Sequence, residues 1–198
     1  MRFGKCIPVW LMLFICAQSF GQYKEGHYYR KDGVRVDGLL RLEYGDHAFR
    51  SKENGDCFIS FKATKEEKRA RLTTADICCF VIEKDSFAVI KNFTLNFLVH
   101  YPRDFAQVLQ DGRIKLYIYY SVVSNSGSGG LMYSNAVKEW VIEKNGQVEK
   151  LTKKIFKNLI PQWLEDYPQL KEKVTSKELR FRDIPEIIKA YNSYFASR

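Results

Sequence analysis

The sequence predicts an α+β fold: an antiparallel sheet or partly closed barrel built from hairpins, with C-terminal helices packed on one face. Alternating strand patterns fill the chain up to residue 150, and helical spacing appears only in residues 151–198. The chain has 198 residues, of which 45% are hydrophobic and 15% aromatic. This composition can build a core and excludes general disorder. We therefore expect one β-rich domain over residues 22–198.

The clearest strand covers residues 113–123, where branched and aromatic side chains alternate with period two. The Asp111-Gly112 pair before it predicts a tight hairpin turn, which would place Gln107 opposite Leu116 and Phe105 opposite Ile118. The two faces of this strand carry different residues: Ile114, Leu116, Ile118, Tyr120 and Val122 on one, and Lys115, Tyr117, Tyr119 and Ser121 on the other.

Two more dipeptides predict hairpin turns. As a two-residue loop, Asp32-Gly33 would place Arg30 opposite Arg35, and the repulsion between them predicts a wet face or one that meets an acidic partner. Asn145-Gly146 predicts the turn of the last hairpin. Strand patterns also cover residues 39–44, 57–63, 77–83, 87–90, 92–100 and 132–143, whereas residues 45–56, 65–71 and 124–130 read as loops or solvated turns.

The pattern becomes helical after residue 150. Residues 151–160 have one apolar helical face, which Pro161 is expected to interrupt. Residues 168–174 predict a short helix, and residues 179–181 a last short strand. Asp183 is expected to cap a final helix that runs from residue 184 to the end, with Pro185 in its first turn.

The first 21 residues match a secretory signal peptide. A basic start is followed by an apolar run over residues 8–17 and by small residues ahead of Gln22. The run is shorter than a membrane-spanning helix, so we expect no transmembrane segment after removal of the signal. A buried N-terminal helix is the alternative. A second alternative is a bacterial lipid anchor on Cys16, although Ile15 is bulkier than that processing site prefers.

Export limits both the partners and the cysteine chemistry. Removal of residues 1–21 takes away two positive charges and no negative one, so the net charge falls from +9 to +7. The remaining basic surface could meet acidic glycans or lipid headgroups, and export argues against nucleic acid as a partner. Cys57, Cys78 and Cys79 remain, and a disulfide could join Cys57 to either Cys78 or Cys79. All three could also be reduced.

No motif predicts catalysis, a metal site or a cofactor. His27, His47 and His100 stand at no metal-ligand spacing, and Asp46 beside His47 is explained by a polar loop. The Ser-Gly run at residues 126–130 lacks the glycine that a nucleophile elbow requires at position 126. The sequence therefore leaves enzymatic activity open and favours its absence.

Candidate binding residues lie on the central strand and the first hairpin. If Tyr117 and Tyr119 faced solvent beside Lys115, they would form an aromatic and basic surface suited to sugars, peptides or anionic polymers. Tyr28, Arg30 and Arg35 would extend such a surface. The alternative is that the C-terminal helices cover this face and make the tyrosines part of the core.

Several short motifs together resemble a group of uncharacterised small exported proteins common in Bacteroidetes-type bacteria. The signal of that group ends near Phe20-Gly21-Gln22, and its last helix ends in a Tyr-Asn pair such as Tyr191-Asn192. Ala75 departs from the proline that is usual in its T-P-x-D-I element. The first hairpin and the central strand match at Gly26, Tyr28, Tyr29, Asp32, Gly33, Val36, Gly38, Gly112, Arg113, Ile114, Leu116 and Tyr117. The resemblance implies export to the periplasm, the outer membrane or the medium, and it implies no activity.

These observations favour a non-catalytic exported domain of the cell envelope that binds a protein or a glycan through a sheet face or an edge strand. A small secreted hydrolase without a recognisable motif is the alternative. It would require one pocket with convergent polar groups, whereas a binding domain would show an exposed patch or edge. Binding to anionic membrane lipid is a third, weaker hypothesis, which predicts that attachment is lost as salt rises.

Overall fold

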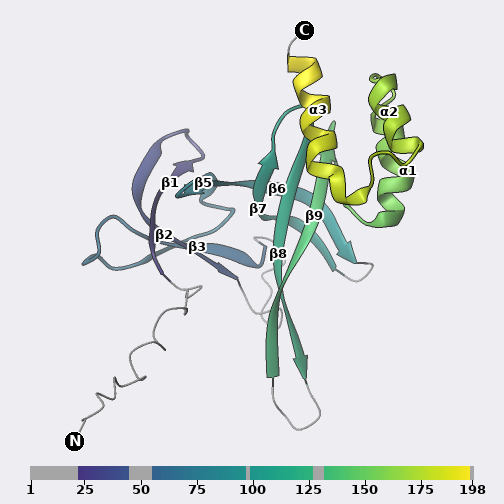
Figure 1. Cartoon of the computed structure of the whole chain (residues 1–198). Helices are drawn as coiled ribbons and strands as arrows, with labels where there is room; N and C mark the ends of the chain where they lie inside the picture. The colour runs from purple at the N-terminus through teal and green to yellow at the C-terminus, as the bar shows by residue number, and fades with distance from the viewer. Residues whose placement is uncertain (1–21, 45–54, 97–98, 127–131, 197–198) are drawn as a thin grey trace, which may run out of the picture.

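The described part of the chain forms one antiparallel sheet with three helices at its C-terminal end. A computed structural model describes residues 22–44, 55–96, 99–126 and 132–196 (Figure 1). The ten strands lie in the order β10-β9-β8-β7-β6-β5-β1-β2-β3-β4, and the sheet is not closed into a barrel. The fold class predicted from the sequence is therefore confirmed. The elements are β1 (Lys24–Arg30), β2 (Arg35–Tyr44), β3 (Cys57–Lys62), β4 (Ala70–Leu72), β5 (Ile77–Ile82), β6 (Asp85–Asn96), β7 (Val99–Gln110), β8 (Ile114–Ser126), β9 (Met132–Lys144), β10 (Gln147–Lys150), α1 (Lys153–Trp163), α2 (Pro168–Thr175), the 3-10 turn η3 (Phe181–Asp183) and α3 (Ile184–Ala196).

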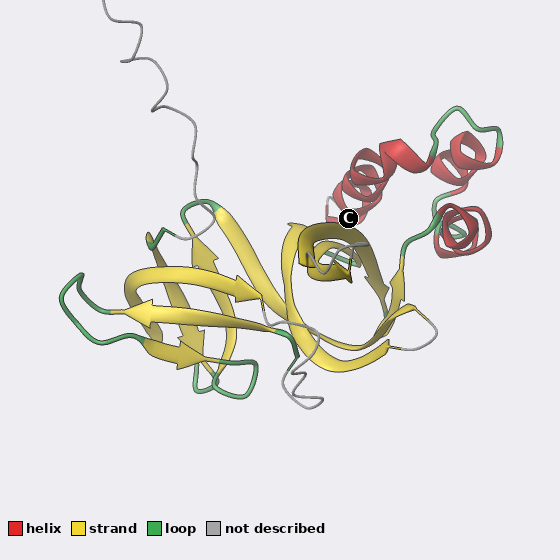
Figure 2. Ribbon diagram, turned by 90° about the horizontal axis from the view of Figure 1, so that it is seen from below, coloured by secondary structure: helices red, strands yellow, loops and turns green. Residues whose placement is uncertain are grey.

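The sheet curls in two directions, so the face turned inward in the N-terminal half is opposite to the face turned inward in the second half (Figure 2). Neighbouring residues of β7 show the change: Phe105 belongs to the core of the N-terminal half, and Ala106 to the core of the second half. In the N-terminal half, β1, β2 and β3 enclose a cluster that includes Leu40, Ile59 and Phe80. In the second half, β6 to β10 curl around the opposite face, and β10 comes close to β6.

The helices pack on the outer face of this second curl. Ile114 and Leu116 of β8 and Ile142 of β9 are fully buried beneath the helices. The helical side chains that cover them include Ile160 of α1 and Ile187 of α3. None of the helices in the described part of the chain has the length and apolarity needed to cross a bilayer.

The first hairpin differs from its predicted register by one residue. The backbone N–H of Arg30 donates to the carbonyl of Val34 at 2.9 Å, so the loop has three residues rather than two. Tyr29 therefore lies opposite Arg35, and the expected pairing of Arg30 with Arg35 is wrong. Gly33 has φ +83°, which fits the glycine that closes a three-residue hairpin.

The central hairpin is shifted by two residues. Gln107 lies opposite Ile118 instead of Leu116, because the turn around Gly112 is longer than two residues: Gln110 lies opposite Leu116. An irregularity between Val108 and Gln110 then changes the register by one residue. The last hairpin has the predicted register: Asn145 and Gly146 have φ values of +53° and +80°, as a type I′ turn requires.

Three other expectations were wrong in detail. The strand expected over residues 92–100 is divided between the end of β6 and the start of β7. α1 continues through Pro161 to Trp163, and residues 181–183 form η3 where a short strand was expected at 179–181. Asp183 accepts a hydrogen bond from the backbone of Arg180 at 2.8 Å, which stabilises η3. The signal peptide and the alternative anchor at Cys16 lie outside the described residues.

Candidate functional site

The end of the β8–β9 hairpin extends beyond the rest of the sheet (Figure 1). β8 and β9 pair without interruption from Ile114 opposite Lys144 to Ser126 opposite Met132. The pairing of β7 with β8 ends at Ile118, and the pairing of β10 with β9 ends at Val141. We call the two-stranded extension, residues 121–126 of β8 and 132–137 of β9, the ribbon. Among the described strands, none pairs with either outer edge of the ribbon.

Two hydrogen bonds show which backbone groups face these edges. The N–H of Leu151 donates to the carbonyl of Trp140 at 2.7 Å, so this carbonyl points away from β8. The thiol of Cys57 lies 3.8 Å from the carbonyl of Tyr120, so that carbonyl points away from β9. Ile118 lies opposite Trp140, and Tyr120 lies opposite Lys138. These two pairs are two residues apart, so in both of them the backbone N–H and C=O groups point outward, away from the other strand of the hairpin.

Alternation along an antiparallel ladder extends this pattern into the ribbon. The register is continuous, so every second residue directs its N–H and C=O outward. On β8 these residues are Val122, Ser124 and Ser126, and on β9 they include Ser134 and Ala136. Ser124 lies directly opposite Ser134. The N–H of Ser124 therefore points to the outer edge of β8, and the N–H of Ser134 points to the outer edge of β9.

The ribbon lacks the charges that usually protect an exposed edge. No charged residue occurs between Lys115 and Lys138, although 28% of the chain is charged. Charged or proline residues on edge strands normally prevent pairing with other chains. Lys138 stands on the β9 side and its ammonium lies 5.5 Å from the ring centre of Tyr120. That contact places the Lys138 charge over a β8 residue at the base of the ribbon, and the residues of both ribbon strands beyond it are uncharged.

A buried carboxylate fixes the base of the ribbon. Asp104 of β7 is fully buried and accepts a hydrogen bond from the hydroxyl of Tyr119 at 2.7 Å. It also accepts backbone N–H bonds from Asp56 at 2.8 Å, Cys57 at 3.1 Å and Phe105 at 2.7 Å. Burial raises the pKa of Asp104 to about 6, although the four hydrogen bonds favour its charged form.

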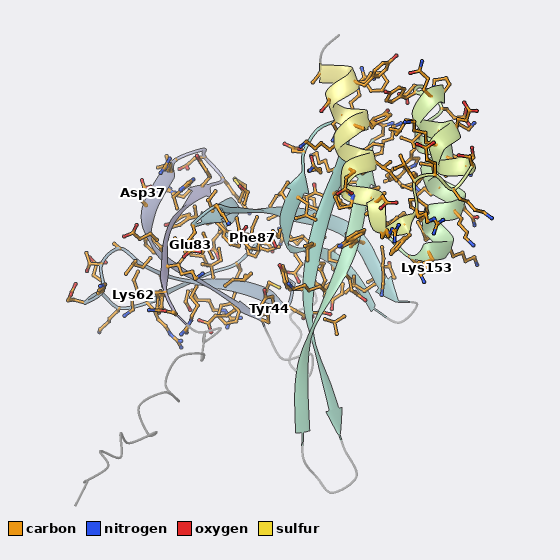
Figure 3. All side chains as sticks on the ribbon, in the orientation of Figure 1. Asp37, Tyr44, Lys62, Glu83, Phe87 and Lys153 are labelled. Atoms are coloured by element: carbon orange, nitrogen blue, oxygen red, sulfur yellow. The ribbon has the colours of Figure 1, made fainter. Side chains whose placement is uncertain are left out.

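Further hydrogen bonds and ring contacts surround this carboxylate. The hydroxyl of Tyr101 donates to Asp56 at 2.8 Å, and the hydroxyl of Tyr120 donates to Gln107 at 2.6 Å. Tyr44, which lies where the N-terminal half meets the long strands (Figure 3), has its ring 5.9 Å from that of Tyr120. Because Asp104 is enclosed, its chemistry is structural, and it gives the ribbon a fixed base.

The central-strand residues predicted to bind a ligand are mostly enclosed. Tyr117 and Tyr119 are 3% and 0% exposed, so their rings do not form a free surface. The curl of the sheet covers them, with Phe93 of β6 5.1 Å from Tyr119 between ring centres, whereas the helices lie on the other face. The hydroxyl of Tyr117 donates to Glu143 at 2.8 Å, and Lys115 lies 4.0 Å from the same carboxylate.

The first-hairpin candidates are divided between the two faces of the sheet. Tyr28 is buried, with its ring edge-on to that of Phe61. Arg30 and Arg35 are exposed and pair with Asp32 at 2.9 Å and Asp37 at 2.6 Å. Asp37 stands at the outside of the N-terminal half (Figure 3). The structure therefore brings Arg35 next to Tyr29 rather than Tyr28.

The three described cysteines are free thiols. Cys57 is buried against β8, and Cys78 is exposed on β5. The predicted disulfide from Cys57 to Cys78 or Cys79 is therefore not formed. Within residues 22–44, 55–96, 99–126 and 132–196, no group of three or more potential ligands could hold a metal ion. His100 contacts Thr94 at 3.2 Å, and His47 lies outside the described residues.

The sequence analysis missed both the ribbon and Asp104. The absence of charged residues between Lys115 and Lys138 could have predicted an unprotected edge in this part of the sheet. No comparable signal distinguishes Asp104 from a solvent-facing aspartate, because its partners come from β3 and β8. No protein-family model, curated protein or solved structure matches the chain.

Proposed function

We propose that this protein is a non-catalytic exported domain of the cell envelope that binds a partner protein through the outer edge of β8. An extended segment of the partner would pair with the ribbon as an additional strand. The observation that carries this proposal is the row of outward backbone groups at Val122, Ser124 and Ser126, which no described strand pairs with. Strand addition satisfies such groups and requires little of the partner's sequence.

Energetics favour this use of the ribbon. An isolated two-stranded hairpin is only marginally stable in water, and a third strand would stabilise it. The base of the ribbon is already ordered by Asp104 and Tyr119, which lowers the conformational entropy that binding must overcome. The uncharged edge also lets a partner approach without unpaired charges becoming buried.

Export is supported by the three-part pattern of residues 1–21 and by the resemblance to small exported proteins. Because of export, the partner should be sought in the cell envelope. Tagged protein recovered from the cell envelope should begin at Gln22, and its intact mass would show this. A chain that keeps Met1 would contradict export, and an acylated Cys16 would place the domain on a membrane.

The docking edge can be tested with two matched proline substitutions. Ser124→Pro removes an outward N–H from the β8 edge, and Ser134→Pro removes the equivalent N–H from the β9 edge. Neither N–H bonds within the ribbon, so both variants should keep its pairing. We expect Ser124→Pro to weaken capture of the envelope partner by about tenfold or more, as loss of about 1.4 kcal/mol would do, while Ser134→Pro binds as wild type.

Quantitative mass spectrometry of cross-linked complexes would measure this capture. Equal capture by all three proteins would refute docking at the β8 edge. Loss only in Ser134→Pro would also refute it, because it would place the partner on β9. Circular dichroism and thermal unfolding would verify that both variants are folded.

A further inference from the structure

Strand β5 contains a bulge at its two adjacent cysteines. Tyr29 of β1 lies opposite Cys79, and Arg30 lies opposite Ile77. Cys78 is therefore an extra residue that has no partner position on β1. A bulge of this kind places two successive residues against one residue of the neighbouring strand and bends the backbone locally.

The bulge brings the two sulfur atoms together. Consecutive residues of a regular strand point to opposite faces, which would separate the two thiols. Here the Sγ atoms of Cys78 and Cys79 lie 3.4 Å apart. Cys78 is exposed, and Cys79 is partly buried. Cys57 is buried separately against the carbonyl of Tyr120, so it is not part of this pair.

We propose that Cys78 and Cys79 form a thiol–disulfide exchange site whose substrate is a low-molecular-weight disulfide. The exposed Cys78 thiolate attacks one sulfur of the substrate, breaks its S–S bond and releases the first thiolate. The Cys79 thiolate then attacks the sulfur of Cys78 and releases the second. The two protons lost by the cysteines are taken up by the two released thiolates. The substrate is thereby reduced to two thiols, and the cysteine pair is oxidised to a disulfide.

The order of the two steps follows from the surroundings of each sulfur. Cys78 is the accessible thiol, and its sulfur lies 3.5 Å from the carbonyl oxygen of Tyr29, so it is the thiol that a substrate in solution meets first. Burial, followed by the neighbouring Cys78, raises the pKa of the Cys79 thiol to about 11. Cys79 is therefore mostly protonated and does not compete for the first attack, and its position 3.4 Å from the Cys78 sulfur lets it resolve the mixed disulfide in the second step.

The product is expected to be easily reduced again. Neighbouring Cα atoms are about 3.8 Å apart, whereas disulfide-bonded residues usually have Cα atoms about 4.4–6.8 Å apart. A disulfide between neighbours is therefore strained, and strained exposed disulfides are the labile ones. The site should consequently cycle between its two states under mild thiol buffers instead of remaining oxidised.

A single tryptic peptide reports on the site. Cleavage after Arg71 and Lys84 releases residues 72–84, whose only cysteines are Cys78 and Cys79. The full chain would be incubated with glutathione disulfide, alkylated and digested. We expect this peptide to escape alkylation and to have a mass two hydrogen atoms below that of its unalkylated dithiol form, which dithiothreitol added after digestion should restore. The folded chain should react about tenfold faster than chain unfolded in urea, because the bulge holds the sulfurs together.

Three variants distinguish the attacking thiol, the resolving thiol and the cysteine that takes no part. Cys79→Ser should accumulate a glutathione adduct at Cys78, because no resolving thiol remains. Cys78→Ser should remain unmodified at Cys79, and Cys57→Ser should still form the Cys78–Cys79 disulfide. The proposal would be overturned if folded wild-type protein gave only a glutathione adduct, gave no product, or reacted no faster than the unfolded chain.

Discussion

The carboxylate of Asp104 joins three strands through one side chain. It accepts backbone N–H bonds from the start of β3 and from β7, and a hydroxyl bond from Tyr119 of β8. Gly55 fits beside it with φ +79°, and an added Cβ there would lie 2.4 Å from the Asp104 carboxyl carbon. This close packing explains why the carboxylate is enclosed rather than available for catalysis.

The titration of Asp104 should make stability depend on pH. Its pKa is about 6 in the folded chain, against about 4 for an unfolded aspartate. Between these values the folded state binds a proton that the unfolded state has lost. The free energy of unfolding should therefore fall as pH rises, by about 1 kcal/mol between pH 5 and pH 7. Urea denaturation at the two pH values would measure this change.

Substitutions isolate the contribution of Asp104 from that of other groups. Asp104→Asn should remove this part of the pH dependence, although it should also lower stability at every pH. Asp37→Asn is the matched control, because Asp37 is exposed and the Arg35 guanidinium lowers its pKa, away from the interval tested. An unchanged pH dependence in Asp104→Asn would show that Asp104 does not titrate there.

Among the elements, α3 is held to the β7–β8 turn by one residue. Asn192 accepts from the N–H of Ile114 at 3.0 Å and donates to the carbonyls of Asp111 at 3.2 Å and Ile114 at 2.7 Å. An added Cβ on Gly112 would lie 2.6 Å from the Asn192 side chain. The neighbouring Tyr191 donates to Asp166 at 2.7 Å, so the Tyr-Asn pair joins α3 to both the sheet and the α1–α2 connection.

Loss of the Asn192 side chain should weaken this attachment. Asn192→Ala removes three hydrogen bonds to the backbone, two of them partly buried, and should lower the free energy of unfolding by about 2 kcal/mol. Ser193→Ala, one position further along an exposed part of the helix, should change it by less than about 0.5 kcal/mol. Chemical denaturation of both variants would decide this. Equal stabilities would mean that apolar packing alone holds α3.

The type of most elements could be predicted from the sequence, but turn lengths and strand registers could not. Alternation along β8 and the apolar spacing in α1 and α3 depend only on local residues. The Asp32-Gly33 signal fits two-residue and three-residue loops equally well, and the choice moves every pairing by one position. The helix through Pro161 is maintained by burial of Ile160 and Trp163, which local propensity does not include.

At the scale of the whole molecule, the sheet buries one face in its N-terminal half, and in its second half it buries the opposite face inside the curl and the outer face beneath the helices. Period-two alternation predicts that β8 has two faces, but it does not state what covers each. The tyrosine face could have met solvent, helices or strands, and the structure places Phe93 and Tyr101 there. The candidate site could not be predicted from β8 alone, because an unpaired edge is defined by where β7 and β10 stop.

The most direct test of the docking claim is amide hydrogen exchange along β8 and β9, with and without the captured partner. Outward amides at Val122, Ser124 and Ser126 should exchange rapidly in the free protein, since no described group bonds to them. Strand addition should slow these three by about tenfold or more, with little change at Ser134 and Ala136. Slowing on β9 alone, or no slowing in the ribbon, would contradict docking at the β8 edge.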